Sequence, residues 1–425
     1  MVDAIIHGDT YNEQIKPANV AVRLLLFAFV VVCVFDPADQ VLGAKGWLFL
    51  ALWGATLAIG LSARDEVNIP IELLACVLLF ILVPLLSITW YYLVSGTDPY
   101  EGFGLLKSYL LISLAIVLVV NRIDIVPLLS GVLTLLALLT ITVSIVLWLE
   151  PELFAILQNI GQNTGVLLLN KRNYGSLSFT QVYFVTSPML AISIPHYFDR
   201  AMSSRGRAKL VNFGLSAISI IAMFLVGLRN SMAVALVLPF VLWPLYTRRI
   251  ALNEFRSLGT LVILALPLVD KLKMFLDPAE TSNNTKLSYL SDYSEILHDP
   301  LTLLFGQGLG AYYEWSSAGT PGFEKTGANF YFITELTYLE LIRNFGVIGA
   351  AIMMFLLAYP IVSAFLVSVD RRPRALAVGF LAYLGMCATN PLLFSSLGML
   401  ILSAVLANIF QQSDGGKFFS LQRLA

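Results

Sequence analysis

Two carboxylates and a guanidinium stand directly before a long apolar run in "GANFYFITELTYLELIRNFGVIGA", residues 327–350. A carboxylate at the edge of an apolar layer is partly desolvated, which raises its pKa toward the working pH and suits it to accept a proton from a hydroxyl group. Glu335 is therefore a candidate general base. Glu340 and Arg343 are three residues apart, so on a helix they can pair with each other. The alternative interpretation is an interfacial helix whose charges face lipid headgroups.

A single arginine, Arg229, lies in a very short connection between two apolar runs in "FLVGLRNSMAVALVLPF". The planar guanidinium can bind two phosphate oxygens at once, so an arginine held between two helix ends is suited to bind a diphosphate. The alternative is an arginine whose apolar stem lies along the helices while its charge reaches the lipid headgroups. Both interpretations put Arg229 at the membrane surface.

Further cations and aromatic residues cluster in the polar parts of the chain. The stretch "NKRNYGSLSFTQ" carries two adjacent cations, and "TKLSYLSDYSEILHDPLTLLFGQGLGAYYEW" combines a lysine, a flexible glycine-rich turn and several aromatic rings. Cations can bind phosphate or glycan and aromatic rings can stack on sugars, although lipid contacts and interfacial aromatic belts use the same residue types. The candidate substrate-binding residues are Lys171, Arg172, Lys286, Tyr313, Tyr338 and Arg343.

The elements that must position these residues are transmembrane helices. Hydrophobic residues make up 58% of the 425 and charged residues only 12%, against about a quarter charged in an ordinary soluble domain. Apolar runs reach the roughly 20 residues that a helix needs to cross a bilayer. We therefore predict an all-α polytopic membrane protein that forms one integral membrane domain over residues 1–425. Twelve spans are expected near 18–35, 46–62, 70–94, 104–120, 125–149, 178–197, 210–227, 230–247, 257–270, 345–368, 375–390 and 396–411.

Lysine and arginine residues are distributed unequally between the loops, which predicts the orientation. If the N-terminus is cytoplasmic, the inner loops hold 16 of the 26 lysine and arginine residues, the short outer loops hold five, and one long outer segment holds five. We predict that both termini are cytoplasmic. The long outer segment, 271–344, lies between the ninth and tenth spans and is expected to contain short amphipathic helices. Function is expected on this outer face.

Several classes of chemistry lack their signatures in this sequence. It contains no Walker-type phosphate loop, no HExxH pair and no Cys/His cluster with zinc spacing, so neither ATP hydrolysis nor a metal site is predicted. Cys33, Cys76 and Cys387 fall within apolar spans and are expected to be small buried hydrophobic residues. The spans carry almost no charge at their centres, which disfavours an ion-coupled transporter.

The order of these pieces resembles the O-antigen polymerase and O-antigen ligase superfamily of bacterial envelope proteins. The motifs "FGQGLG" and "GVIG" and the glutamate-containing helix carry the resemblance, and "LVGLRNS" and "RNYGSLSF" support it. The resemblance implies a GT-C-like membrane fold, an important arginine at Arg229 and a further basic residue at Lys286. In the ligase branch a histidine stands at the position of Glu335, and the next residue, Leu336, also departs from that branch. The chain is therefore more similar to a Wzy-type polymerase.

A Wzy-type polymerase would transfer an oligosaccharide from undecaprenyl diphosphate to another lipid-linked repeat unit, at the periplasmic face of the bacterial inner membrane. Because isoprenoid diphosphate is already a good leaving group, the resemblance implies neither a metal nor a cofactor. Arg229, with Lys286 and Arg172, would hold the diphosphate and stabilise its growing charge. Glu335 would deprotonate the acceptor hydroxyl.

The same interpretation identifies the binding partners. They are the undecaprenyl-diphosphate-linked oligosaccharide, the lipid bilayer, a polysaccharide chain-length regulator and a flippase, with no nucleic acid. Within the site, Arg343 or Tyr338 would orient Glu335.

Four other functions fit parts of the pattern. A ligase would pass the glycan to lipid A core or to a protein, but the histidine of that branch is missing here. A peptidoglycan polymerase of the shape–elongation–division–sporulation type favours an aspartate in the large outer loop, for which Asp292 or Asp299 could serve. A flippase or transporter of lipid-linked oligosaccharide should line a central cavity with cations at mid-depth, which the sequence does not show. A scaffold protein of a polysaccharide assembly complex would not need Arg229 in so tight a turn.

Overall fold

The protein is mainly helical, as the sequence predicts. The computed structural model describes residues 17–39, 41–62, 68–96, 98–174, 177–246, 281–311, 313–314, 330–331, 336–366, 368, 370–411 and 418–420. Helices account for 80% of the structure, and the described strands form three antiparallel pairs. The long apolar helices confirm the prediction of a membrane-embedded, all-α class.

Within the described residues, five helical segments are long and apolar enough to cross a membrane. They are α4 (Ile71–Ser95), the continuous α5–α6 segment (Tyr100–Leu110 and Leu114–Val120), α7 (Val126–Leu149), α10 (Gly206–Leu225) and α15 (Thr337–Leu366). The bundle also contains α2 (Pro17–Phe35), α3 (Lys45–Ser62), α9 (Leu190–Ser203), α11 (Arg229–Leu242), α16 (Arg371–Cys387) and α17 (Ser396–Gln411). The ninth predicted span, 257–270, lies outside the described residues.

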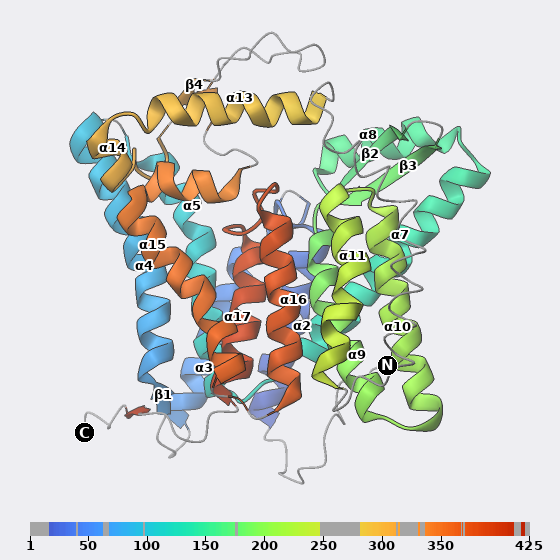
Figure 1. Ribbon diagram of the computed structural model, residues 1–425. Coiled ribbons are helices and arrows are strands. Elements are labelled where there is room, and N and C mark those ends of the chain that lie inside the picture. The colour runs from blue at the N-terminus through green and yellow to red at the C-terminus, as the bar shows by residue number, and fades with distance from the viewer. Residues whose placement is uncertain are drawn as a thin grey trace.

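Short elements gather at one end of the bundle, which is the upper end in Figure 1. They are α8 (Leu153–Thr164), the hairpin of β2 (Leu167–Tyr174) and β3 (Leu177–Phe184), α13 (Thr281–Ile296), α14 (Pro300–Phe305), β4 (Tyr313–Glu314) and β5 (Phe330–Tyr331). α13 runs across this upper end (Figure 1). At the lower end, β1 (Asn68–Pro70) pairs with β6 (Phe418–Ser420).

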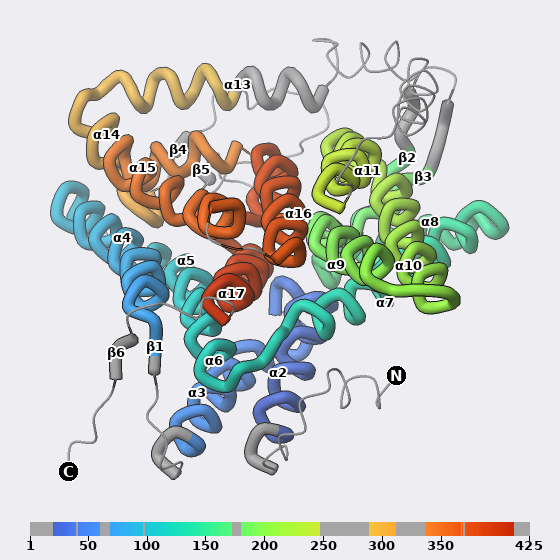
Figure 2. The backbone as a smooth tube through the Cα atoms, turned by 60° about the horizontal axis from the view of Figure 1, so that its bottom comes forward, coloured from blue at the N-terminus to red at the C-terminus, as the bar shows by residue number. Residues whose placement is uncertain are grey.

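α17 lies at the centre of the bundle, between the group of α7, α9, α10 and α11 and the group of α4, α5 and α15 (Figure 2). Every residue from Ser396 to Asn408 is buried, as expected for a uniformly apolar helix that protein encloses on all sides. Two polar side chains tie α17 to its neighbours. Ser403 and Gln411 donate hydrogen bonds to backbone carbonyls of the α5–α6 segment and of the turn that follows it.

The two ends of the bundle carry different sets of predicted loops. The lower end holds the described turn before α7, the connection between α9 and α10 and the start of α16, which were all predicted as inner loops. These segments carry Arg122, Arg200, Arg205, Arg207, Lys209, Arg371, Arg372 and Arg374. Most of the described arginine residues therefore lie at the end opposite α13.

The sixth predicted span, 178–197, is wrong in its first part. Residues Leu177–Phe184 form β3, which pairs with β2 through the whole hairpin, and α9 begins only at Leu190. The register pairs Leu167 with Phe184 and Tyr174 with Leu177. The apolar content of this stretch suggested a helix, but Leu177–Phe184 is rich in the aromatic and β-branched residues that favour strands.

α15 consists of two helical parts that meet at Gly346. This residue has φ +65° and ψ 177°, a conformation that is essentially restricted to glycine. A Cβ atom at Gly346 would also collide with the backbone of Leu304, at the end of α14. The first part, 337–345, therefore lies at an angle to the longer second part and stays at the upper end (Figure 1).

Candidate functional site

The end of α16 holds the first part of α15. The Thr337 hydroxyl donates a hydrogen bond to the carbonyl of Asn390 at 2.9 Å, and the Tyr338 hydroxyl donates to the carbonyl of Leu384 at 2.7 Å. Thr337 is buried and Tyr338 is half-buried. The polypeptide therefore enters α15 at a fixed position on the end of α16, directly after the segment that carries Glu335.

Arg229 is the first residue of α11, in the tight connection that the sequence predicts. Gly227 has φ +66°, which reverses the chain, and Leu228 is extended before the helix begins. The side chain of Arg229 is half-buried. The amide of the next residue, Asn230, donates to the hydroxyl of Thr389 at 2.6 Å. The loop after α16 thus touches the start of α11 as well as the start of α15.

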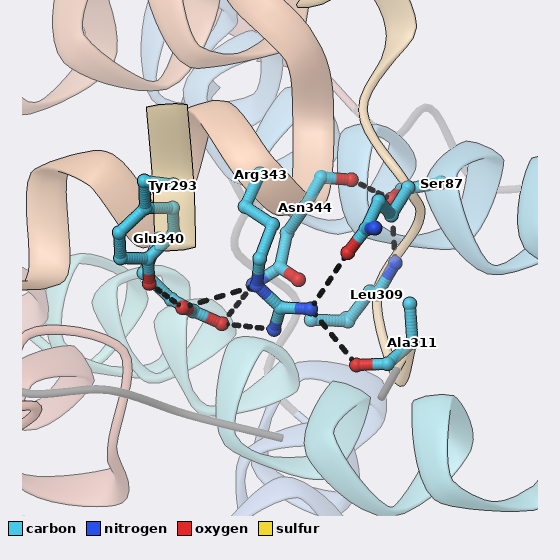
Figure 3. A network of polar contacts seen from close by, with 8 residues as sticks. Ser87, Tyr293, Leu309, Ala311, Glu340, Arg343 and Asn344 are labelled. Atoms are coloured by element: carbon cyan, nitrogen blue, oxygen red, sulfur yellow. Dashed lines mark hydrogen bonds and ion pairs between the residues drawn. The ribbon is translucent and has the colours of Figure 1, made fainter. Parts of the chain in front are cut away.

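A buried arginine organises the region behind this loop (Figure 3). Arg343 has no exposed surface, and its guanidinium forms an ion pair with Glu340. Its Nη1 atom donates to the side-chain oxygen of Gln307 at 3.2 Å and to the carbonyl of Ala311 at 2.9 Å. The pairing of Glu340 and Arg343 was predicted, but the headgroup-facing alternative is wrong, because both side chains are buried.

Glu340 connects Arg343 to a second set of donors. Its carboxylate accepts hydrogen bonds from the hydroxyl of Tyr293 on α13 and, at 3.0 Å, from the amide of Asn344. Tyr293 is only 3% exposed and Glu340 is 7% exposed. A buried carboxylate needs this number of donors, since an ion removed from water without partners costs several kcal/mol, by an order-of-magnitude estimate.

The segment 306–310, "GQGLG", passes between three helices and is tightly packed, although the sequence suggested a flexible turn. Gly306, Gly308 and Gly310 have φ values of +80°, +103° and +97°. A Cβ atom at Gly306 would lie 2.6 Å from the backbone nitrogen of Gly346, and one at Gly310 would lie 2.6 Å from that of Gly102. Only glycine fits these positions, and the spacing of the motif reflects this close approach.

Ser87 on α4 fixes the same segment from its other side. Its hydroxyl donates to the carbonyl of Asn344 at 2.6 Å and accepts a hydrogen bond from the backbone N–H of Leu309 at 2.8 Å. The backbone N–H of Gln307 donates to the carbonyl of Arg343 at 2.6 Å. The glycine-rich segment, α4 and the first part of α15 therefore form one hydrogen-bonded unit.

Glu335, the predicted general base, lies outside the described residues, directly before Leu336 and the start of α15. The two residues predicted to orient it have other partners. Tyr338 donates to the end of α16, and Arg343 pairs with Glu340. Neither observation tests the role of Glu335, so that role stays a prediction.

The other predicted binding residues are spread over the upper end. Lys171 is exposed on β2, with its ammonium 5.3 Å from the centroid of the Phe154 ring. Arg172 also belongs to β2, Lys286 to α13 and Tyr313 to β4, and their side chains lie outside the described residues. The loop after α16 connects the start of α11, which carries Arg229, to the start of α15. The hydrogen bond from Tyr293 to Glu340 connects α13, which carries Lys286, to the same helix.

Most residues of the buried polar network were not predicted from the sequence to be functional. Tyr293, Gln307, Asn344 and Ser87 were not candidates, and Glu340 was considered only as a partner of Arg343. The available signals were indirect, namely a serine in the apolar α4 and a tyrosine in the polar α13. Partners that are 32 to 47 residues away along the chain cannot be assigned from local spacing.

The three cysteines are free and buried, as predicted. Within the described part of the chain, no group of three or more His, Cys, Asp or Glu side chains is arranged to hold a metal ion. No protein-family model matches the sequence, and no curated protein matches it. The resemblance to the O-antigen polymerase and ligase superfamily therefore stays a prediction from the motifs.

Proposed function

We propose that this protein is a polysaccharide polymerase of the bacterial inner membrane. It would transfer an undecaprenyl-diphosphate-linked glycan to another lipid-linked repeat unit at the periplasmic face. One observation carries the proposal: the loop after α16 holds two elements at adjacent residues. The hydroxyl of Thr389 accepts a hydrogen bond from Asn230, the residue after Arg229. The carbonyl of Asn390 accepts one from Thr337, two positions after Glu335. The start of the helix that follows the proposed base and the start of the helix that carries the proposed cation thus meet at one loop.

The chemistry requires only groups of these types. The acceptor hydroxyl oxygen attacks the anomeric carbon, its proton passes to the carboxylate of Glu335, and the bond between that carbon and the diphosphate oxygen breaks. Undecaprenyl diphosphate leaves with the bonding electrons, so negative charge grows on its oxygens, where the guanidinium of Arg229 would stabilise it. A direct displacement of this kind inverts the anomeric configuration.

The upper end is assigned to the periplasm on the basis of charge. The lower end carries most of the described arginine residues, and positively charged loops stay in the cytoplasm. Under this assignment Arg229, Lys171 and α13 face the periplasm, where lipid-linked repeat units are joined. The proposed site then lies at the headgroup level, within reach of a diphosphate on a membrane-embedded lipid.

A complementation experiment tests the proposal. Cells that lack this chain would receive wild type, Glu335→Gln or Arg229→Ala at matched membrane levels, and the surface polysaccharide would be separated on a gel. Glu101→Gln, an exposed carboxylate on α5, and Arg205→Ala, an exposed arginine at the lower end, serve as controls. We expect a ladder for wild type and both controls, and single repeat units for the two site variants.

Other outcomes identify other functions. If the deletion leaves full-length polymer on undecaprenyl diphosphate that never reaches its acceptor, the protein is a ligase. If lipid-linked repeat units accumulate on the cytoplasmic side, it is a flippase. If the deleted cells still build the full ladder, the protein is not the polymerase.

A further inference from the structure

α13 crosses the upper end but buries little apolar surface. Eleven of its sixteen residues are Thr, Ser, Asn, Lys, Asp or Glu. In the part with described side chains, Leu290, Ser291, Ser294 and Glu295 are exposed. Asp292 and Tyr293 are buried and Tyr289 and Ile296 are half-buried, so the inward face of this part of α13 is narrow and includes polar groups. Specific polar contacts therefore help to determine where the helix lies.

Tyr293 supplies such a contact. Its side chain is buried, and its hydroxyl donates to the carboxylate of Glu340 on α15. Figure 3 shows this carboxylate between the tyrosine on one side and the guanidinium of Arg343 on the other. The chain of contacts therefore runs from α13 through Glu340 and Arg343 to Gln307 and Ala311.

The chemistry of these contacts indicates that they position structural elements relative to one another. A buried ion pair contributes little net stability, because the desolvation of two charges offsets their attraction. Apolar residues of similar size would serve the core at least as well. A planar guanidinium, in contrast, offers several donors in fixed directions, and Arg343 uses them to hold α15 and the segment 306–311 in one relative geometry.

The helical register connects this anchor to a predicted binding residue. Lys286 lies seven residues before Tyr293 on α13, which is close to two helical turns and about 10 Å along the axis. Two positions seven residues apart share one face of a helix. A displacement of the anchored tyrosine would therefore displace the position of Lys286 as well.

We propose that Tyr293, Glu340 and Arg343 are positioning residues that hold α13 across the upper end, so that Lys286 meets the diphosphate of the lipid-linked donor. The proposal rests on the proposed polymerase function, and it reassigns Arg343 from substrate binding to positioning. Tyr293 acts through the placement of α13 and touches neither the sugar nor the diphosphate.

A structural measurement tests the anchor without any reference to activity. Spin labels would be attached to Leu290→Cys on α13 and Tyr100→Cys on α5, two exposed sites, because the three native cysteines are buried. Double electron–electron resonance on the full chain in lipid nanodiscs should give one narrow distance distribution. Tyr293→Phe should broaden it, whereas Tyr92→Phe, which alters an exposed tyrosine on α4, should not. A distribution unchanged by Tyr293→Phe would overturn the proposal.

A kinetic measurement tests the consequence. Full-length protein in proteoliposomes would be given the undecaprenyl-diphosphate-linked repeat unit extracted from cells that lack the chain. Tyr293→Phe and Lys286→Ala should each raise KM about tenfold with little change in kcat. The KM of the double variant should be no higher than the larger of the two single-variant KM values, because the two residues act through one helix. Effects that multiply, or a Tyr293→Phe variant with wild-type KM, would contradict the proposed connection.

The two proposals fail in different ways. If wild type builds no polymer in proteoliposomes, the polymerase function is wrong, and the distance measurement still decides whether Tyr293 anchors α13. If wild type is active and Glu335→Gln is inactive while Tyr293→Phe is unchanged in both assays, the polymerase function holds and the positioning proposal is wrong.

Discussion

Each end of the bundle contains an arginine–carboxylate pair, but the two pairs differ in their surroundings. Arg343 and Glu340 lie three residues apart on α15, with side chains that are 0% and 9% exposed. Arg372 joins the start of α16 to Asp124, 248 residues away, and both side chains are 32% exposed. The buried pair is local in sequence, whereas the half-exposed pair connects distant segments.

The difference shows what each pair requires from the fold. The pair at the lower end is partly open to solvent, and the backbone N–H of Val126 gives Asp124 one further hydrogen bond. The upper pair has lost its water, and Tyr293, Asn344 and Gln307 supply hydrogen bonds in its place. Building such a set requires several segments to converge, and the glycine-rich segment makes this convergence sterically feasible. The upper pair should therefore be far more sensitive to change than the lower pair.

The largest effect is expected at the glycines that permit the convergence. Gly346→Ala places a methyl group against the backbone of Leu304 and strains a conformation that other residues avoid, so it should destabilise the protein by more than about 3 kcal/mol. The lower-end Gly206 also has a positive φ, but its Cβ position is open. Gly206→Ala should cost only about 1 kcal/mol. Thermal unfolding in detergent compares the two, and equal losses would refute this account.

The next effect separates the two ion pairs directly. Arg343→Met leaves Glu340 buried without its cation and should cost about 3–5 kcal/mol. Arg372→Met removes a half-exposed pair and should lower the free energy of unfolding by about 0–1 kcal/mol. This loss should be smaller at high salt, which screens the pair in the wild type. Denaturant unfolding of both variants measures the contrast.

A double variant provides the control for this comparison. Arg343→Met combined with Glu340→Leu removes both charges and should recover part of the loss, because no uncompensated ion remains buried. If the double variant is as unstable as the single one, the loss comes from the hydrogen bonds that the pair makes to its surroundings and not from charge.

The buried pair also shows how far the sequence alone could lead. The spacing of Glu340 and Arg343 predicted their pairing, because it is a property of one helix. Their burial depends on Tyr293 and Ser87 from other helices and on Gln307 from the glycine-rich segment, and no local pattern encodes those contacts. The same reasoning predicted the tight connection at Arg229, where all determinants lie within a few residues.

The hairpin at 167–184 shows a different cause of error. Its second strand was assigned to the sixth span because its apolar residues run on into those of α9. The predicted spans 125–149 and 210–227 lie close to α7 and α10, since an uninterrupted apolar run of sufficient length has few other interpretations in a membrane protein. Span prediction therefore works for long runs and fails for short structures that lie at the end of the bundle.

A smaller effect is expected from the serine that connects three segments. Ser87→Ala leaves the N–H of Leu309 and one hydrogen-bonding site at the carbonyl of Asn344 without this partner, and should cost about 1–3 kcal/mol. Thr89→Ala on the same helix is the matched control, because the exposed Thr89 hydroxyl bonds only to the carbonyl of Leu85 in its own helix. Its effect on the unfolding temperature should be close to zero. A similar loss for both variants would show that Ser87 contributes only through α4 itself.

The smallest effect is expected for an exposed charge at the upper end. Its contribution to stability should be small, like that of the half-exposed pair at the lower end. Asp299 caps α14, and the backbone N–H of Thr302 donates to its carboxylate and lowers its pKa. Because the pKa is lower in the folded state, this stabilisation is present above the unfolded-state pKa and is lost as the pH falls through the folded-state pKa. Asp299→Ala should therefore lower the unfolding temperature slightly at neutral pH, and the difference from wild type should disappear as the pH falls through the lowered folded-state pKa of Asp299. A difference that persists in acid would mean that Asp299 acts through packing and not through its charge.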